Sequence, residues 1–137
     1  MSCYKAIRYL LVHSSPVAAI VGTRIYPVVV DEGDVAAGIA YPCLVITVIS
    51  EQSLTFATLE NVQIYDARVQ VTAFARDYGT KESLLAAVVN ACRSGNATID
   101  GVTVRMIITG QLGPDFMDQG ATKLFMQSQD FHAKYTL

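Results

Sequence analysis

Three polar side chains near the end of the chain have the residue types used in nucleophilic catalysis. Ser128, Asp130 and His132 alternate along a segment of strand-like composition and therefore share one face of it. Successive positions on one face of a strand lie about 6.5 to 7 Å apart, whereas a serine and its histidine base must approach to roughly 3 Å. Catalytic triads usually converge from separate segments. The pattern therefore predicts the polar face of a strand.

A second possible chemistry is phosphate binding. Gly79-Thr80-Lys81 is similar to the end of a phosphate-binding loop. Such a loop needs a glycine five residues before its Gly-Lys pair and a serine or threonine after the lysine. Here the lysine follows a threonine and precedes Glu82, so the match fails. The segment instead predicts the N-terminus of a helix.

Metal binding would have to use the acidic cluster Asp31, Glu32 and Asp34 or the two histidines, His13 and His132. A calcium loop needs a bidentate glutamate after its alternating acidic positions, and no such residue follows the cluster at a useful spacing. The histidines do not form a zinc-binding His-Glu-x-x-His pattern. The cluster is interpreted as a solvated loop or as a charged contact with a partner. We therefore predict no catalytic, cofactor-binding or metal site, no cofactor and no enzymatic activity.

Composition limits the classes of partner. The 137 residues predict a single domain, residues 1–137, and a hydrophobic fraction of 52% is enough to build a core. A net charge of −2 gives no basic excess for wrapping nucleic acid. No apolar run reaches the roughly 18 residues of a membrane span, and the N-terminus does not read as a signal peptide. Cys3, Cys43 and Cys92 form no paired motif, so we expect reduced thiols.

Apolar periodicity predicts two helices. The first covers residues 3–14 with Ser2 as its N-cap, and a short helical turn restarts at Ser15 and ends near Gly22. The second covers residues 80–94 and carries an apolar stripe, with Thr80 as its N-cap.

Strand patterns occupy most of the remaining chain. They cover residues 24–27, 43–50, 62–76, 102–109 and 122–136, and the third of these alternates clearly between apolar and polar residues. Three long loops are expected at residues 28–40, 51–61 and 110–121. The order predicts an α+β fold: an antiparallel sheet of about four main strands with two helices packed on one face, plus long loops.

Several segments, read together, resemble the tail completion proteins of long-tailed bacteriophages, also called tail terminators. The similarity begins with an N-terminal helix that leads into Val21-Gly22-Thr23-Arg24-Ile25-Tyr26-Pro27, followed by the segment from Tyr41 to Ser50. It continues through the segment from Ala67 to Ala75 and the helix from Thr80 to Ser94. It closes with Asp130-Phe131 and Tyr135, so that it covers most of the chain.

The resemblance implies a structural virion protein that forms a ring, usually of six subunits, at the head-proximal end of the tail tube. The implied partners are further copies of the chain, the tail tube protein and the head connector, and the ring would be assembled in the host bacterial cytoplasm. DNA would pass through the ring without sequence-specific binding, and no membrane is involved. The alternatives are a head–tail neck adaptor and a small non-viral ligand-binding α+β domain.

A ring of this kind needs two different complementary faces on each subunit. We expect the three loops to contact ring neighbours, tube or connector. Arg24, Arg68 and Arg76 are the candidates for ion pairs between subunits, although contacts within one subunit or with solvent are the simpler interpretation. Their candidate partners are acidic side chains, namely Asp31, Glu32, Asp34 and Asp66.

Overall fold

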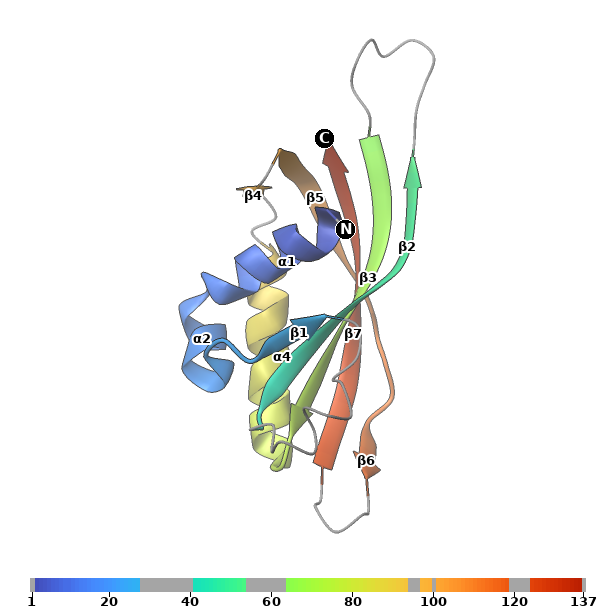
Figure 1. The fold of residues 1–137 in the computed structure, drawn as a ribbon. Coiled ribbons are helices and arrows are strands. Elements are labelled where there is room, and N and C mark those ends of the chain that lie inside the picture. Colours follow the sequence, from blue (N-terminus) through green and yellow to red (C-terminus); the bar gives the residue numbers. More distant parts are fainter. Residues whose placement is uncertain are drawn as a thin grey trace.

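The computed structural model describes residues 2–27, 41–53, 64–93, 97–99, 101–118 and 124–136. These residues form a long, curled sheet with three helices packed against one of its faces (Figure 1). The opposite face of the sheet, which we call the outer face, carries none of the helices that the structure describes. The predicted α+β class is confirmed.

The sheet has seven strands in the order β1-β2-β3-β7-β5-β4, and β6 pairs with β7 off this path. Their bounds are β1 Ile25–Pro27, β2 Cys43–Ser53, β3 Ile64–Ala75, β4 Ala97–Ile99, β5 Val102–Leu112, β6 Phe116–Asp118 and β7 Leu124–Thr136. β1 runs parallel to β2, and every other pair is antiparallel. The four long strands β2, β3, β7 and β5 are the predicted main strands. The sheet is wider than predicted because three short strands extend it.

The alternation predicted for the central strand is confirmed in β3. Val69 and Val71 are fully buried beneath the helices, whereas Arg68 between Ala67 and Val69 is exposed on the outer face. Successive side chains of a strand point to opposite faces, so this pattern fixes which face receives the helical layer. The same face of β7 contributes the fully buried Phe131.

The helices number three in the described residues, not two: α1 Ser2–Val12, α2 Ser15–Val21 and α4 Tyr78–Arg93. The predicted short turn after Ser15 is a separate helix, because Ser14 is extended and proline is tolerated in a first helical turn. Gly22 ends α2 with a φ of 60°, and its N–H donates a hydrogen bond of 2.8 Å to the carbonyl oxygen of Ala18.

The start of α4 corrects the predicted N-cap. The helix begins at Tyr78, before Thr80, and the capping acceptor is the carboxylate of Asp77. The backbone N–H of Thr80 donates to Asp77 Oδ2 at 3.0 Å, and the Thr80 hydroxyl donates to the same oxygen at 3.2 Å. Aspartate satisfies an otherwise unpaired N–H and places negative charge at the positive end of the helix.

A single hydrophobic core lies between the helices and the sheet. All three helices contribute fully buried side chains to it, and β2, β3 and β7 supply the facing residues. The largest of these apolar side chains are Ile7, Leu11, Val17, Val21, Leu84, Val88, Leu44, Ile46, Val69, Val71 and Phe131. Among the described helices, none combines the length and apolar character needed to cross a membrane.

The predicted loops are the main point of difference. Residues 28–40 lie outside the described residues, and of the loop at 51–61 the described part, 51–53, continues β2. The glycines and the proline of residues 110–121 predict a loop. In the structure, β5 instead runs to Leu112 and β6 follows at residues 116–118. Gly110 and Gly113 are needed for close approach: a Cβ would lie 3.1 Å from the Asp130 carbonyl oxygen or 3.2 Å from that of Ser128.

Candidate assembly surface

The outer face of the sheet is polar along its centre. Arg68 of β3 and Asp130 of β7 form an ion pair, with 2.6 Å between the guanidinium Nη2 and the carboxylate Oδ2. Thr72 and Ser128 share a hydrogen bond of 2.8 Å between their hydroxyl oxygens. His132 is exposed on the same face. Ser128 and Asp130 therefore serve separate cross-strand contacts, and with His132 they form the predicted polar strand face.

Pairing registers align the side chains of this face into rows across the four long strands. Ser50 of β2 pairs with Arg68, Arg68 pairs with His132, and His132 pairs with Ile108 of β5. Ser50 and Ile108 therefore end one row at opposite edges of the sheet. The next row, Gln52, Asp66, Lys134 and Met106, has the same layout.

One edge of the sheet is formed by β5. β4 pairs with β5 only at Val102–Val104, and no other described strand lies on this side of β5. The exposed Arg105 follows, and after it residues 106–112 carry no charge, while several of their apolar side chains are about half exposed. Ile108, for example, is 49% exposed. A long uncharged edge is unusual, because proteins commonly protect such strands with charges or proline.

The other edge of the sheet is formed by the residues of β2 that follow its pairing with the short strand β1. β1 pairs with Leu44–Ile46, and among the described strands none continues this pairing alongside the residues that follow. A register shift between Val48 and Ser50 exposes Ile49. Glu51 is also exposed and gives this edge a negative charge.

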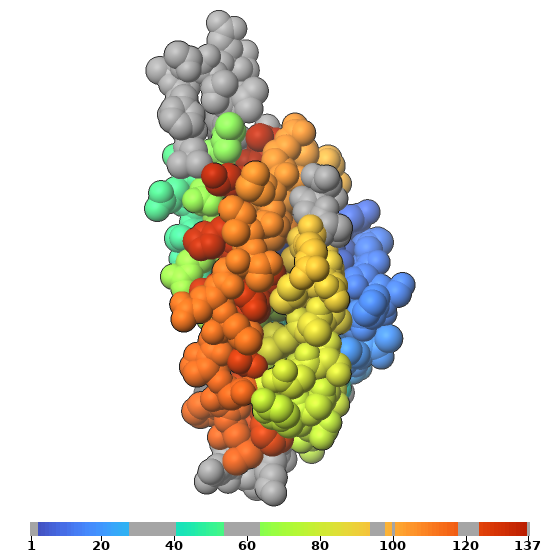
Figure 2. All heavy atoms as spheres, turned by 180° about the vertical axis from the view of Figure 1, so that it is seen from behind, coloured from blue at the N-terminus to red at the C-terminus, as the bar shows by residue number. Residues whose placement is uncertain are grey.

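A groove of about 320 Å³ runs between α4 and the β5 edge. Leu85 and Val89 line its helical side, Leu112 lines its strand side, and Arg93 lies at its rim. Figure 2 shows α4 in yellow beside β5 in orange on this side of the molecule. Glu82, Asn90 and two glutamines of β7 also line the groove, so its apolar patch is bordered by polar side chains and by charges of both signs.

A buried lysine holds the neighbouring end of the sheet together. Lys81 of α4 is 0% exposed, and its Nζ donates to Gln127 Oε1 at 2.8 Å and to a carboxylate oxygen of Asp115. The Nζ also lies 4.4 Å from the centre of the Tyr78 ring. Gln127 Nε2 in turn donates to the Gly113 carbonyl oxygen at 2.7 Å. These bonds attach the segment before β6 to both layers of the fold.

Sequence reasoning placed Lys81 at a helix start but missed its burial. The signal lies in the spacing, since Lys81, Leu84, Leu85, Val88 and Cys92 follow a helical repeat and all are buried. A lysine within an apolar stripe must find partners inside the protein, because an unpaired buried charge is costly.

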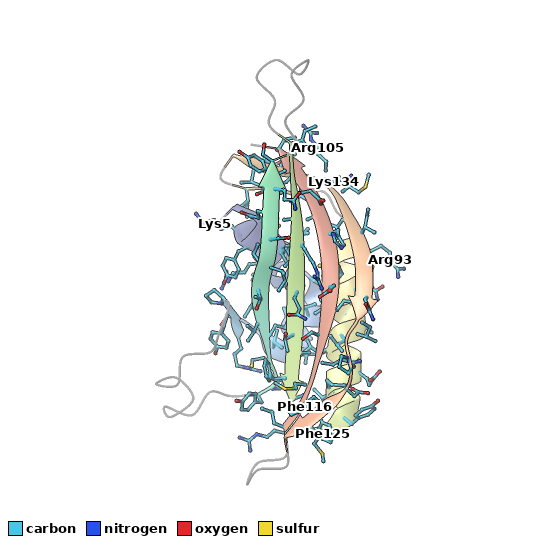
Figure 3. All side chains as sticks on the ribbon, turned by 90° about the vertical axis from the view of Figure 1, so that its right-hand side faces the viewer. Lys5, Arg93, Arg105, Phe116, Phe125 and Lys134 are labelled. Atoms are coloured by element: carbon cyan, nitrogen blue, oxygen red, sulfur yellow. The ribbon has the colours of Figure 1, made fainter. Side chains whose placement is uncertain are left out.

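The end of the sheet that the lysine secures is aromatic. Phe116 of β6 is 58% exposed, and Met117 beside it is partly exposed. Tyr78 makes an edge-on contact with Phe125 of β7, with ring centres 5.8 Å apart. Figure 3 shows Phe116 and Phe125 at this end and Arg105 and Lys134 at the other. The two ends of the sheet therefore differ in chemistry.

The arginines predicted as interface residues all have contacts within the chain. Arg24 donates to the carbonyl oxygens of Pro42 at 2.9 Å and Ile20 at 3.2 Å, and so links α2 to the start of β2. Arg68 pairs with Asp130. Arg76 lies 5.6 Å from the centre of the Tyr41 ring.

The acidic candidates are placed only in part. Asp66 lies on the outer face of β3, and its Oδ1 is buried without a hydrogen-bond partner among the described residues. Asp31, Glu32 and Asp34 lie outside the described residues. The structure thus brings none of these four into an ion pair with the three arginines within the part of the chain that it describes.

The three cysteines are buried and free, as predicted. Burial raises the pKa of Cys3 and of Cys92 to about 12 and that of Cys43 to about 11. Protonated thiols are poor nucleophiles and poor metal ligands. Across the described ranges, no three histidine, cysteine or carboxylate residues are grouped so that they could hold a metal ion.

The family model for tail completion protein gp17 matches residues 5–136. The chain belongs to this family. The match confirms the resemblance seen in the sequence and identifies the chain as a structural protein of the bacteriophage tail.

A solved structure shares the fold of this tail completion protein. A chain from the virion of a native gene transfer agent particle superposes with a TM-score of 0.70, at 14% sequence identity. The similarity covers 99% of this chain and 96% of that chain. No curated protein gives a significant sequence match.

Proposed function

We propose that this tail completion protein forms a closed ring of six copies at the head-proximal end of the tail tube. There the ring stops the addition of tube subunits and presents a docking face to the head connector. The observation that carries this proposal is the family match over residues 5–136. The likeness to a chain of a gene transfer agent virion supports a place within a phage-like particle assembled in the host cytoplasm.

Unlike edges support a head-to-tail arrangement of the copies. A closed ring needs two different surfaces on each subunit, because the same interface is repeated by rotation until the last copy meets the first. The β5 edge is uncharged from Met106 to Leu112 and exposes the apolar side chains of both these residues, whereas the β2 edge carries Glu51. Two like surfaces would instead favour a closed dimer.

Unlike ends support two different axial partners. The end with Phe116 offers exposed apolar side chains, whereas the end with Arg105 and Lys134 carries charges of both signs, since Asp66 pairs with Lys134 across the strands (Figure 3). One end would bind the tube and the other the connector. The Lys81 contacts hold the aromatic end in a fixed position before a partner arrives, which lowers the ordering cost of binding.

A ring at this position surrounds the path of the DNA. The net charge of −2 provides no general attraction for the phosphate backbone, so DNA can pass without being held. The interface role of Arg24, Arg68 and Arg76 with Asp31, Glu32, Asp34 or Asp66 stays a prediction. Arg68 and Arg76 are both exposed and can reach a neighbouring copy, whereas Arg24 is partly buried.

Electron microscopy of lysates from a phage that lacks this gene tests the proposal. Overlong tails without heads would support a protein that caps the tube. Tails of normal length beside separate DNA-filled heads would assign the protein to the neck as an adaptor. Intact infectious particles would contradict both roles and leave a non-viral ligand-binding domain as the alternative.

A further inference from the structure

Two backbone edges of the sheet have no strand neighbour among the described residues, at Met106–Leu112 of β5 and at Val48–Gln52 of β2. The N–H and C=O groups of such edges are a template for pairing with another strand. We propose that the β5 edge of one copy pairs with the β2 edge of the next, so that the sheets join into one closed sheet. This proposal rests on the ring proposed above.

The two edges lie at the same height in the sheet. Ser50 and Ile108 end one row, and Gln52 and Met106 end the next. Neighbours in a ring are related by rotation without translation. With strands aligned near the ring axis, the row that ends at Ile108 in one copy therefore continues at Ser50 of the next.

The strand directions are compatible with this pairing. β2, β3, β7 and β5 alternate in direction, because each adjacent pair is antiparallel. β5 therefore runs opposite to β2 within one copy. Rotation about an axis along the strands preserves direction, so β5 of one copy also meets β2 of its neighbour antiparallel. Antiparallel pairing is the slightly more stable of the two ladder types.

The side chains at the two edges are complementary. Met106 and Ile108 are each 49% exposed on the β5 side, and Ile49 is 45% exposed on the β2 side. Extending the rows places Glu51 of the neighbour opposite Ile107. The pairing would therefore cover apolar side chains that are exposed in a single copy.

A second copy of the chain fits this surface better than another occupant. The uncharged β5 edge needs a second strand edge whose residues lie in the same rows of the sheet. Every copy of the chain carries such an edge on β2, so a second copy can supply it. Pairing of two β5 edges with each other would close a dimer and leave both β2 edges open. That dimer is the competing arrangement that the experiment must detect.

Cysteine cross-linking on isolated tails tests the pairing. Phage carrying both Ser50→Cys and Ile108→Cys is prepared, and its tails are treated with a bifunctional maleimide. Within one chain the two positions are three strand spacings apart, or roughly 14 Å. A reagent shorter than this distance can therefore link them only between two copies. The native thiols are fully buried and stay unreactive. We expect a ladder of covalent oligomers from the double variant and only monomer from each single variant.

A matched control and a second pair complete the design. Ser50→Cys with Ser15→Cys introduces two exposed thiols, but Ser15 begins α2 in the helical layer and lies on neither edge of the sheet, so this variant should give no ladder. Gln52→Cys with Met106→Cys probes the next row and serves if the first pair impairs folding, which circular dichroism reports.

Two results would overturn the inference. Covalent dimers from Ile108→Cys alone would show that β5 edges pair with each other. Tails of normal length that carry either double variant and yield no ladder would show that the ring closes through other surfaces, while leaving the capping function intact. The length of tails without the gene tests that function separately.

Discussion

Lys81 of α4 donates a hydrogen bond of 2.8 Å to the side-chain oxygen of Gln127 in β7, 46 residues away in the sequence. Both residues are buried, and the same ammonium contacts Asp115. The bond joins the helical layer to the sheet at the end that carries β6. The position of the aromatic end thus depends on a buried polar contact as well as on apolar packing.

Replacement of Lys81 by methionine should destabilise the protein by about 1 to 3 kcal/mol, because the buried Gln127 oxygen loses its donor. Arg93→Met on the same helix is the matched control, since Arg93 is exposed, and it should cost less than about 1 kcal/mol. Urea unfolding of both variants provides the measurement. Equal stabilities would show that the lysine contacts contribute nothing.

Arg68→Ala should lower stability by about 1 to 3 kcal/mol, because it leaves the carboxylate of Asp130, whose side chain is only 13% exposed, without its partner. A double-mutant cycle with Asp130→Asn measures the coupling. If Arg68 also contacts a ring neighbour, the folded Arg68→Glu variant should cap tails poorly. Capping at the wild-type level would remove Arg68 from the predicted interface.

Stability should fall as the pH rises above about 9, the ordinary pKa of the thiols. Burial raises the pKa of Cys3 to about 12, so the folded protein keeps a proton that the unfolded chain releases. The stabilisation from this thiol is complete below pH 9 and is lost as the pH approaches 12.

The contribution of Cys3 can be isolated by comparing the wild type with Cys3→Ala. Between pH 8 and about 10.5, the free energy of unfolding measured in urea should fall in both proteins. The fall should be smaller in the variant than in the wild type by on the order of 2 kcal/mol. Parallel pH profiles for the two proteins would contradict this account.

Phe116→Ser should change the free energy of unfolding by less than about 0.5 kcal/mol, because the side chain is 58% exposed. Its effect should appear in assembly. Overlong tails in the variant would assign the aromatic end to the tube, and normal tails without heads would assign it to the connector. Particles at the wild-type yield would show that this end binds neither.

The sequence predicts the central sheet well because its signals are local. Alternation in residues 64–75 and the apolar stripe of residues 84–92 each identify a buried face without any tertiary information. The short strands β4 and β6 have three residues each, too few to show a period. Their formation depends on neighbours that are distant in sequence.

The candidate surface is less predictable for the same reason. Gly110 and Gly113 indicate a loop when read locally, yet they permit β5 and the following residues to pass close to the backbone of β7. The alignment of Ser50 with Ile108 follows from three successive pairing registers, which the sequence does not specify. The interface candidates were chosen by charge, whereas the exposed edges are mostly uncharged.

Cryo-electron microscopy of the head-proximal end of intact tails tests the central claim most directly. The account predicts a single closed ring of this chain at the end of the tube, in contact with the connector on its other side. Density for the chain elsewhere in the particle, or a tube that meets the connector without it, would contradict the account.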